Sequence, residues 1–361
     1  MKKTRSITEW IRPELLKLSA YQVPDATGLI KLDAMENPYR WETDLVDQWL
    51  NSLREVALNR YPDAQASQLK QQLRTCMNIP ESADIILGNG SDELILMLTL
   101  AFNRPEHVLL VPEPSFLMYS IWAKAVGMQM INVILEPENF DLDMFAMLEA
   151  IETHQPALMF LASPNNPTGN LFASEDIEMI LETSSGIVVI DEAYAPFAGT
   201  TLMSRLQDYE NLLIMRTVSK LGLAGLRLGF LVGSVDLLAQ INKVRQPYNI
   251  NALTQHSACF ALQHYSIFTE QVNRIKVDRD HLFNQLMALD GVHVWQSQTN
   301  FLLFRVDHAE KVFADLKTAG ILIKCVHGRH PTLDNCLQVT VGSSEDNEIF
   351  LSALTQSLAN N

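Results

Sequence analysis

The sequence predicts an α/β protein with a large domain on a mostly parallel, doubly wound sheet and a smaller α+β domain. The 361 residues are 47% apolar, which is enough for more than one hydrophobic core. Short apolar runs alternate with longer helical patterns through the middle of the chain, as in parallel α/β sheets. The pattern becomes helical and then mixed after residue 250. We therefore expect an N-terminal segment (1–35) beside the small domain and the active site, a large domain (36–250) and a small domain (251–361).

The expected strands of the large domain are short and show little polar alternation, which is typical of strands covered on both faces. They are 84–87, 107–111, 130–134, 157–161, 187–190, 212–215 and 230–232. Helical patterns lie between several of them, at 92–102, 119–126, 142–152 and 174–183. The last part shows a long helical pattern at 251–289, strands at 301–306 and 337–341, and helices at 309–319 and 345–357.

The net charge of −15 argues against nucleic acid and anionic membranes as partners, but it leaves small anionic ligands open. The four cysteines have no paired spacing and no histidine at metal spacing, so we expect reduced thiols, a cytoplasmic protein and no metal site. The basic start has no continuous apolar stretch, and no run of 18 apolar residues occurs. We therefore expect neither a signal peptide nor a membrane span.

The segment IVVIDEAY places Asp191 at the end of a buried strand. Open α/β sheets bind ligands at that edge, and a buried carboxylate needs a cation or several donors beside it. A protonated pyridine nitrogen would meet that need. A cap on the following helix is the alternative explanation for this residue.

The segment MRTVSKLGLAGLRLGF places Lys220 after another expected strand, among apolar and small residues. Such surroundings can lower the pKa of an ammonium group and free the amine to attack an aldehyde. Thr217, Ser219 and Arg227 add two hydroxyls and a guanidinium, which suit a phosphate ester. An isolated exposed lysine is the alternative.

Two loops complete the set. In GNGSDE (88–93), glycines let the backbone approach an anion in front of a helix N-terminus, although structural turns have similar sequences. In SPNNPTG (163–169), two prolines fix a loop that presents Asn165 and Asn166 as neutral donors, and it too could be a plain turn. An amine, a carboxylate, an amide donor and a phosphate cradle, each closing a strand, are what pyridoxal 5′-phosphate requires.

With these segments, the chain resembles the fold-type I aminotransferases, and within them the histidinol-phosphate aminotransferase family, over nearly its whole length. The resemblance rests on LDAMENPY, LNRYPD, GNGSDE, PSFLMY, SPNNPTG, DEAYAPF, RTVSKLGLAGLRLGF, TNFLLFRV and LQVTVGSSEDN. It implies transfer of an amino group between L-histidinol phosphate and 2-oxoglutarate in histidine biosynthesis. It also implies a homodimer with shared active sites.

The resemblance also implies a role for each matching residue. Lys220 would hold the cofactor covalently and move the proton, Asp191 would pair with the pyridinium, and Tyr194 and Asn166 would bond the phenolic oxygen. The remaining positions would contact the phosphate, the ring or the substrate. The phosphate would meet Ser91, Asp92, Thr217, Ser219, Arg227 and, from the neighbouring subunit, Tyr61; Phe116 would stack on the ring, and Tyr21, Asn166, Lys324, Arg329 and Gln338 would contact the substrate.

Three positions depart from the usual pattern of this family. Phe116 stands where tyrosine is more usual, and the stretch from Lys220 to Arg227 is one residue shorter than in many relatives. Gln338 stands where relatives usually have an arginine that binds the anionic group of the substrate. A neutral hydrogen bond in place of a charge-assisted one would weaken binding roughly tenfold. Gln338→Arg is therefore expected to lower the Michaelis constant, unless Lys324 or Arg329 compensates.

Two alternatives remain open from the sequence. The same residues could serve an aromatic or other amino-acid aminotransferase, or a decarboxylase of phosphate-ester amino acids. A regulatory protein that binds the cofactor without turnover is a more remote possibility, since the lysine, the aspartate and the phosphate set are all present.

Overall fold

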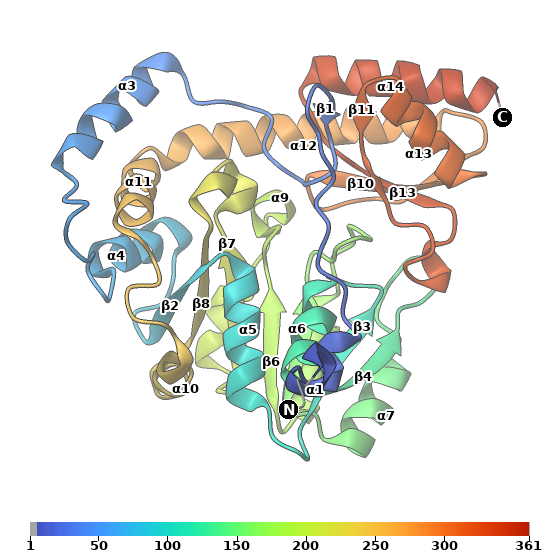
Figure 1. Cartoon of the computed structure of the whole chain (residues 1–361). Coiled ribbons are helices and arrows are strands. Elements are labelled where there is room, and N and C mark those ends of the chain that lie inside the picture. Colours follow the sequence, from blue (N-terminus) through green and yellow to red (C-terminus); the bar gives the residue numbers. More distant parts are fainter. Residues whose placement is uncertain (1–5, 361) are drawn as a thin grey trace, which may run out of the picture.

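The computed structural model describes residues 6–360 and contains a central seven-stranded sheet (Figure 1). The strand order is β2-β8-β7-β6-β5-β3-β4. The strands are β2 (Ala83–Asn89), β3 (Val108–Glu113), β4 (Gln129–Ile134), β5 (Leu158–Ala162), β6 (Ile187–Asp191), β7 (Leu212–Thr217) and β8 (Leu228–Ser234). All pairs are parallel except those of β8, which runs antiparallel to β2 and to β7. The sequence expectation of a mostly parallel α/β sheet is thus confirmed.

Both faces of this sheet are covered by helices, because alternate residues of each strand are apolar on either side. One face packs on α5 (Ser91–Phe102), α6 (Met118–Val126) and α10 (Val235–Ile241). The other face packs on α4 (Ser67–Met77), α7 (Met144–His154), α8 (Ser174–Thr183) and α9 (Ala195–Ala198). The strands therefore lie in the core, and their polar residues collect at the strand ends.

The C-terminal part forms a second, four-stranded antiparallel sheet in the order β12-β13-β10-β9. Its strands are β9 (Val292–Val294), β10 (Phe301–Val306), β12 (Lys324–Cys325) and β13 (Cys336–Thr340). The helices of this part are α11 (Ala252–Gln263), α12 (Tyr265–Met287), α13 (Ala309–Thr318) and α14 (Ser344–Ala359). Helix α11 contacts α4, while α12 runs from there to α14 and the small sheet (Figure 1).

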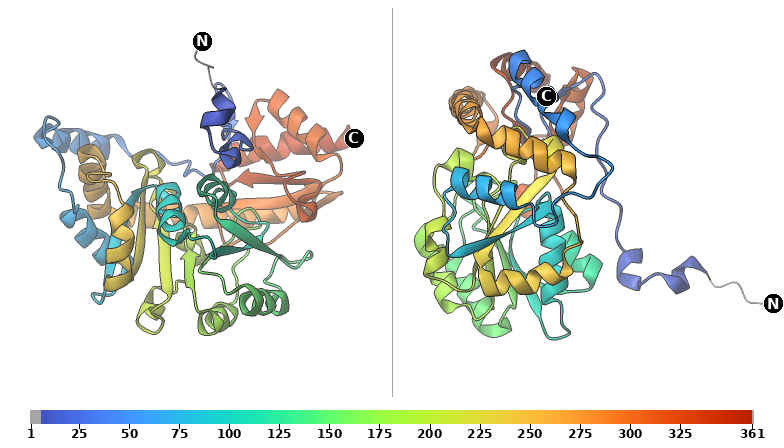
Figure 2. Two further views of the ribbon diagram at one scale, coloured as in Figure 1. Left: turned by 60° about the horizontal axis from the view of Figure 1, so that its bottom comes forward. Right: turned by 90° about the vertical axis from the view of Figure 1, so that its left-hand side faces the viewer.

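The N-terminal part divides between the two sheets. Helices α1 (Ile7–Trp10) and α2 (Pro13–Leu16) stand out from the body, with α2 against α6 (Figure 2). Strand β1 (Ile30–Lys31) pairs in parallel with β11 (Ile321–Leu322), and α3 (Thr43–Ser52) follows. Within residues 6–360, every helix is either too short or too polar to cross a bilayer. The division into three units expected above remains a proposal.

Short 3-10 turns connect several of these elements. They are η1 (Leu53–Glu55), η2 (Met203–Gln207), η3 (Ser219–Leu221), η4 (Ala224–Leu226), η5 (Asn242–Val244) and η6 (Pro331–Leu333). Turn η3 matters most for the site, because it begins just beyond the end of β7 and carries Lys220.

Candidate functional site

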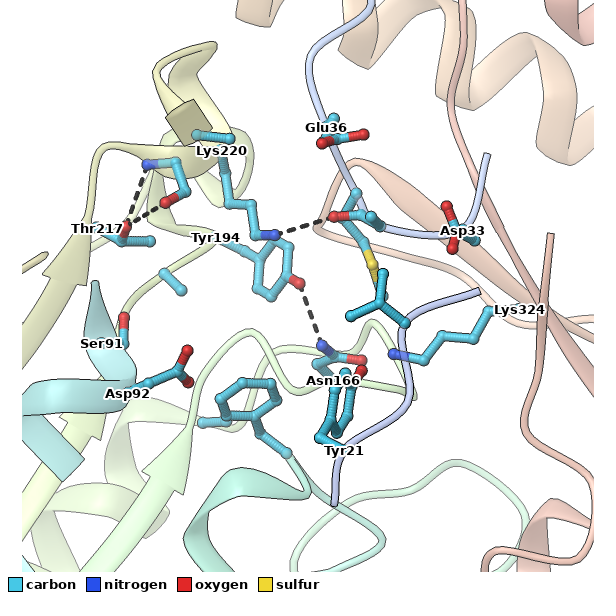
Figure 3. Close-up of a pocket in the computed structure, with 18 of the residues that line it drawn as sticks. Tyr21, Asp33, Glu36, Ser91, Asp92, Asn166, Tyr194, Thr217, Lys220 and Lys324 are labelled. Atoms are coloured by element: carbon cyan, nitrogen blue, oxygen red, sulfur yellow. Dashed lines mark hydrogen bonds between the residues drawn. The ribbon is translucent and has the colours of Figure 1, made fainter. Parts of the chain in front are cut away.

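A cavity of about 460 Å³ lies at the carboxyl ends of the central strands (Figure 3). Parallel pairing brings the end of β5 beside Asp191 of β6, and Asp191 beside the end of β7. Loops after neighbouring parallel strands therefore meet at one edge. Of the residues singled out from the sequence, the cavity is lined by Tyr21, Ser91, Asp92, Phe116, Asn166, Asp191, Tyr194, Thr217, Ser219, Lys220, Arg227, Lys324 and Arg329.

Asp191 is a buried carboxylate that lines this cavity and is 4% exposed. It accepts hydrogen bonds from the Tyr119 hydroxyl at 2.7 Å and from the Ala193 N–H at 3.0 Å. Burial raises its pKa to about 6, although both hydrogen bonds act in the opposite direction. No described cation forms an ion pair with it, so a protonated ring nitrogen in the cavity would supply the missing charge.

Lys220 extends from η3 into the same cavity, so the amine and the carboxylate share one space. Its Nζ donates to the backbone carbonyl of Ala34 at 3.2 Å and lies 5.7 Å from the centre of the Tyr194 ring. Burial lowers the pKa of Lys220 to about 8. A sizeable fraction of the amine is therefore neutral near physiological pH, which is the form that attacks a carbonyl.

The segments around the N-terminus of α5 form an anion cradle. No side chain caps this helix, so the N–H groups of its first turn are available. Thr217 and Ser219 bring their hydroxyls to 2.8 Å of each other, and Arg227 lies 3.3 Å from Asp92. Arg227 adopts a left-handed backbone conformation (φ 49°), an uncommon state for a non-glycine residue that often marks a functional position.

Two glycines are required for the close approach of these segments. A Cβ atom on Gly90 would come within 2.6 Å of Nη2 of Arg227, and one on Gly229 within 2.8 Å of the Ser91 nitrogen. A side chain at Gly229 would displace the backbone of Gly90 and Ser91, while one at Gly90 would displace the guanidinium of Arg227 and strain a backbone with a φ of 76°. The cradle therefore depends on backbone contact, as a phosphate site at a helix N-terminus requires.

Asn166 and Tyr194 lie side by side on another wall of the cavity (Figure 3). Nδ2 of Asn166 donates to the Tyr194 hydroxyl at 3.2 Å. Burial is the largest cause that raises the pKa of Tyr194, so its hydroxyl stays protonated. Phe116 also lines the cavity and can offer a ring face.

The cationic residues Lys324 and Arg329 lie at the boundary between this cavity and a second one of about 320 Å³. Tyr21 and Phe116 also line both cavities. Burial lowers the pKa of Lys324 to about 8, and Arg329 adds to the effect. Neither cation forms an ion pair with a carboxylate among residues 6–360, so both are available to an anionic ligand.

Three residues singled out from the sequence lie outside the cavity wall. Asn165, which was expected to present a donor at this edge, is buried away from the cavity, and its Nδ2 donates to the Pro114 carbonyl at 2.9 Å and to the Thr168 hydroxyl at 2.7 Å. Gln338 is buried behind Asn166, and its amide donors point to Oδ1 of Asn166 and to the Pro167 carbonyl, not to the cavity. Tyr61 is 81% exposed and stacks on Tyr248 with 4.6 Å between ring centres. The contact expected between Tyr61 and a neighbouring subunit remains a prediction.

The sequence reasoning missed several residues of this region. It assigned no role to Tyr119, although the hydroxyl of this residue holds Asp191. It also missed the wall formed by Lys31, Asp33, Ala34 and Glu36, where Lys31 forms ion pairs with both carboxylates. A buried tyrosine within a helix gives no local signal of such a contact, and only the fold brings residues 31–36 to the cavity.

Fold and cavity define a class of enzyme: one that holds a phosphorylated aromatic aldehyde on a lysine amine. The residues fit such a group, because the cavity is lined both by a buried carboxylate that has no cationic partner among the described residues and by an anion cradle. A family model for aminotransferase class I and II matches residues 27–354. The chain therefore belongs to the class I and II aminotransferase family.

Proteins that are similar to this chain point to one group within the family. The chain is 51% identical to the histidinol-phosphate aminotransferase 2 of Nitrosococcus oceani over 96% of this chain and 97% of that protein. It is 47% identical to the histidinol-phosphate aminotransferase 2 of Cupriavidus pinatubonensis over 96% of each. The crystal structure of a histidinol-phosphate aminotransferase from Sinorhizobium meliloti with pyridoxal-5′-phosphate has the same fold, with a TM-score of 0.86 and 19% identity over 97% of this chain and 98% of that one.

Proposed function

We propose that this aminotransferase transfers the amino group of L-histidinol phosphate to 2-oxoglutarate in histidine biosynthesis, with pyridoxal 5′-phosphate attached to Lys220. The observation that carries the proposal is that Lys220, Asp191 and the anion cradle line one cavity. When bound, the cofactor supplies a conjugated ring that withdraws electrons from the substrate carbon.

Each residue has a task that follows from its surroundings. Nζ of Lys220, with a pKa of about 8, can accept and return a proton near neutral pH. Asp191 would bind the protonated ring nitrogen, while Tyr194 and Asn166 would donate to the phenolic oxygen. The phosphate would be held by the N–H groups of Ser91 and Asp92 and by the side chains of Thr217, Ser219 and Arg227, all of which line the cavity.

The substrate assignment is supported by the identity to proteins named histidinol-phosphate aminotransferase and by the charges in the cavity. Both proposed substrates are anions, and Lys324 and Arg329 have no ion-pair partner among residues 6–360. Tyr21 lies on the same wall, and the second cavity offers space for the distal part of a substrate. Gln338 is expected to act on the substrate indirectly, because its donors are used by Asn166 and Pro167.

A substrate panel tests this proposal. Purified enzyme is supplied with 2-oxoglutarate and with histidinol phosphate, phenylalanine or threonine phosphate, while glutamate and carbon dioxide are measured. We expect glutamate to form fastest with histidinol phosphate. Fastest turnover of phenylalanine, or release of carbon dioxide from threonine phosphate, would reassign the enzyme to one of the alternatives above. Cofactor absorbance without any transamination would favour the regulatory protein.

We also propose a homodimer with shared sites and a cytoplasmic location. The exposed Tyr61, outside the cavity of its own chain, supports the first. The second rests on the unpatterned cysteines, all four of which are free thiols.

A further inference from the structure

A chain of side-chain hydrogen bonds runs from Gln338 through Asn166 to Tyr194. Nε2 of Gln338 donates to Oδ1 of Asn166 at 3.1 Å, and Nδ2 of Asn166 donates to the Tyr194 hydroxyl at 3.2 Å. The three residues are 1%, 8% and 4% exposed, respectively. Gln338 lies away from the cavity and is almost fully buried, so the orientation of its amide is set by its protein neighbours.

The direction of donation along these side-chain hydrogen bonds is fixed at the Gln338 end by a backbone carbonyl. The Pro167 oxygen lies 3.4 Å from Nε2 of Gln338, and a carbonyl oxygen can accept but cannot donate. If the Gln338 amide were reversed, its oxygen would face the Pro167 carbonyl oxygen, an acceptor whose role cannot change. Nε2 must therefore point to Pro167 and Asn166, which makes Oδ1 of Asn166 the acceptor and turns Nδ2 towards Tyr194.

This orientation decides where the Tyr194 proton can go. Since the Tyr194 oxygen accepts from Asn166, its own O–H is left for another acceptor, and none is present among residues 6–360. Burial raises the pKa of Tyr194, so the proton is retained. The Tyr194 O–H is therefore a free donor in the wall of the cavity, close to Lys220.

An unpaired atom on Gln338 supports a role for its amide. Oε1 is buried and has no hydrogen-bond partner among the described residues. An unpaired buried oxygen costs free energy, so an apolar residue of the same size would pack here at lower cost. The presence of an amide at this position is explained by the two hydrogen bonds that it donates to Asn166 and Pro167.

We propose that Gln338 is a positioning residue that acts through Asn166 to direct the Tyr194 proton at the phenolic oxygen of the bound cofactor. The proposal rests on the cofactor assignment above, but not on the substrate. A donor at this oxygen stabilises the form that carries more negative charge there. It therefore lowers the pH at which the Lys220–cofactor linkage loses its proton, which is visible in the cofactor absorbance.

Other charges also act on that linkage and must stay constant in the experiment. Asp191 on β6, Asp92 on α5 and Glu36 on the N-terminal segment contribute negative charge around Lys220. Lys31 on β1, Arg227 after η4 and Lys324 on β12 contribute positive charge. Gln338→Met is therefore the variant of choice, because it preserves size and adds no charge.

The test is a pH titration of the absorbance of the bound cofactor, without substrate, in four enzymes: wild type, Gln338→Met, Asn166→Ala and the double variant. In Gln338→Met, Asn166 can rotate, and we expect the spectroscopic pKa to rise by about half a unit to one unit. In the Asn166→Ala background, the same change should produce no further shift, since coupled residues are not additive. Gln338→Arg keeps the N–H donors and should not raise the pKa.

The controls separate positioning from packing. Cys336→Ala removes a buried side chain from the same face of β13 without touching the hydrogen-bond chain, and thermal unfolding measures the packing loss in every variant. An unchanged spectroscopic pKa in Gln338→Met, or an equal shift with and without Asn166, would overturn the proposal. Failure of the wild type to bind the cofactor would instead contradict the proposed function.

Discussion

Replacing Tyr119 by phenylalanine would test how the protein controls the buried Asp191 carboxylate. The Tyr119 hydroxyl donates to Oδ2 of Asp191 at 2.7 Å, and the Ala193 N–H is the remaining described donor. The ring of Tyr119 stacks on Phe160 with 4.6 Å between centres. Phenylalanine preserves this stacking, so the substitution removes mainly one hydrogen bond.

The expected effect follows from the charge on the acceptor. A hydrogen bond is worth about 1.5–3 kcal/mol to a charged group and about 0.5–1.5 kcal/mol between neutral groups. The midpoints of these two ranges differ by about 1.3 kcal/mol, which corresponds to a rise of about one unit in the pKa of Asp191. The variant should therefore hold the Asp191 proton at higher pH than the wild type.

The effect on stability has a definite sign. Burial raises the pKa of Asp191 from 3.8 to about 6, so the folded protein binds this proton more tightly than the unfolded chain. The contribution of Asp191 to the free energy of unfolding therefore falls as pH rises from 3.8 to about 6, and levels off above. In Tyr119→Phe this pH range should extend upward by about one unit, so the variant should lose about 1.3 kcal/mol more of its free energy of unfolding at pH 8 than at pH 5.

Urea unfolding of the cofactor-free enzyme at pH 5 and pH 8 measures this difference. Tyr265→Phe is a suitable control, because that hydroxyl contacts the sulfur of Met77 and no carboxylate. Its effect should be the same at both pH values. An equal loss at pH 5 and pH 8 for Tyr119→Phe would refute the reasoning.

Three further predictions concern the proposed roles of single residues. Lys220→Ala should lower turnover by at least about 10²–10⁴-fold. Borohydride reduction of the wild type, followed by peptide mass spectrometry, should locate the cofactor on Lys220. A label on another lysine would contradict the assignment. Because the pKa of Lys324 is about 8, the Michaelis constant for the anionic substrate should rise as pH increases from 7.5 to 9.5, and this rise should be smaller in Lys324→Gln; an equally steep rise in the variant would contradict the role of Lys324. If the active sites are shared between subunits, mixing inactive Lys220→Ala subunits with inactive Tyr61→Ala subunits should restore activity in the mixed dimer. A mixed dimer without activity would exclude a role of Tyr61 in the neighbouring site.

The sequence predicted the central sheet well because its strands are buried on both faces and their apolar runs are unmistakable. Residues at the ends of those strands, such as Asp191 and Lys220, could therefore be placed at one edge of the sheet from their positions in the sequence. The single antiparallel strand, β8, gave no such signal, since strand direction is not encoded in local composition. Helix α10 was missed as well, although Ser234 caps its N-terminus.

The N-terminal wall and the surroundings of Gln338 could not be predicted by the same means. Residues 31–36 reach the cavity through the pairing of β1 with β11, a contact between distant parts of the chain. Gln338 has the polarity of a ligand-binding residue, and its position one layer behind Asn166 depends on the docking of two sheets. Local patterns identify which groups are present, whereas long-range packing decides which atom faces which.

The pairing of Ile30–Lys31 with Ile321–Leu322 has a consequence for biosynthesis. A ribosome makes the chain from its N-terminus, so the partner of the first strand emerges almost 300 residues later. Until then, the carbonyl of Ala34 has no neighbouring strand to hold it near Lys220. The pocket therefore gains this wall only after nearly the whole polypeptide has been synthesised, at the same stage as Lys324 and Arg329, which line it from the C-terminal part of the chain.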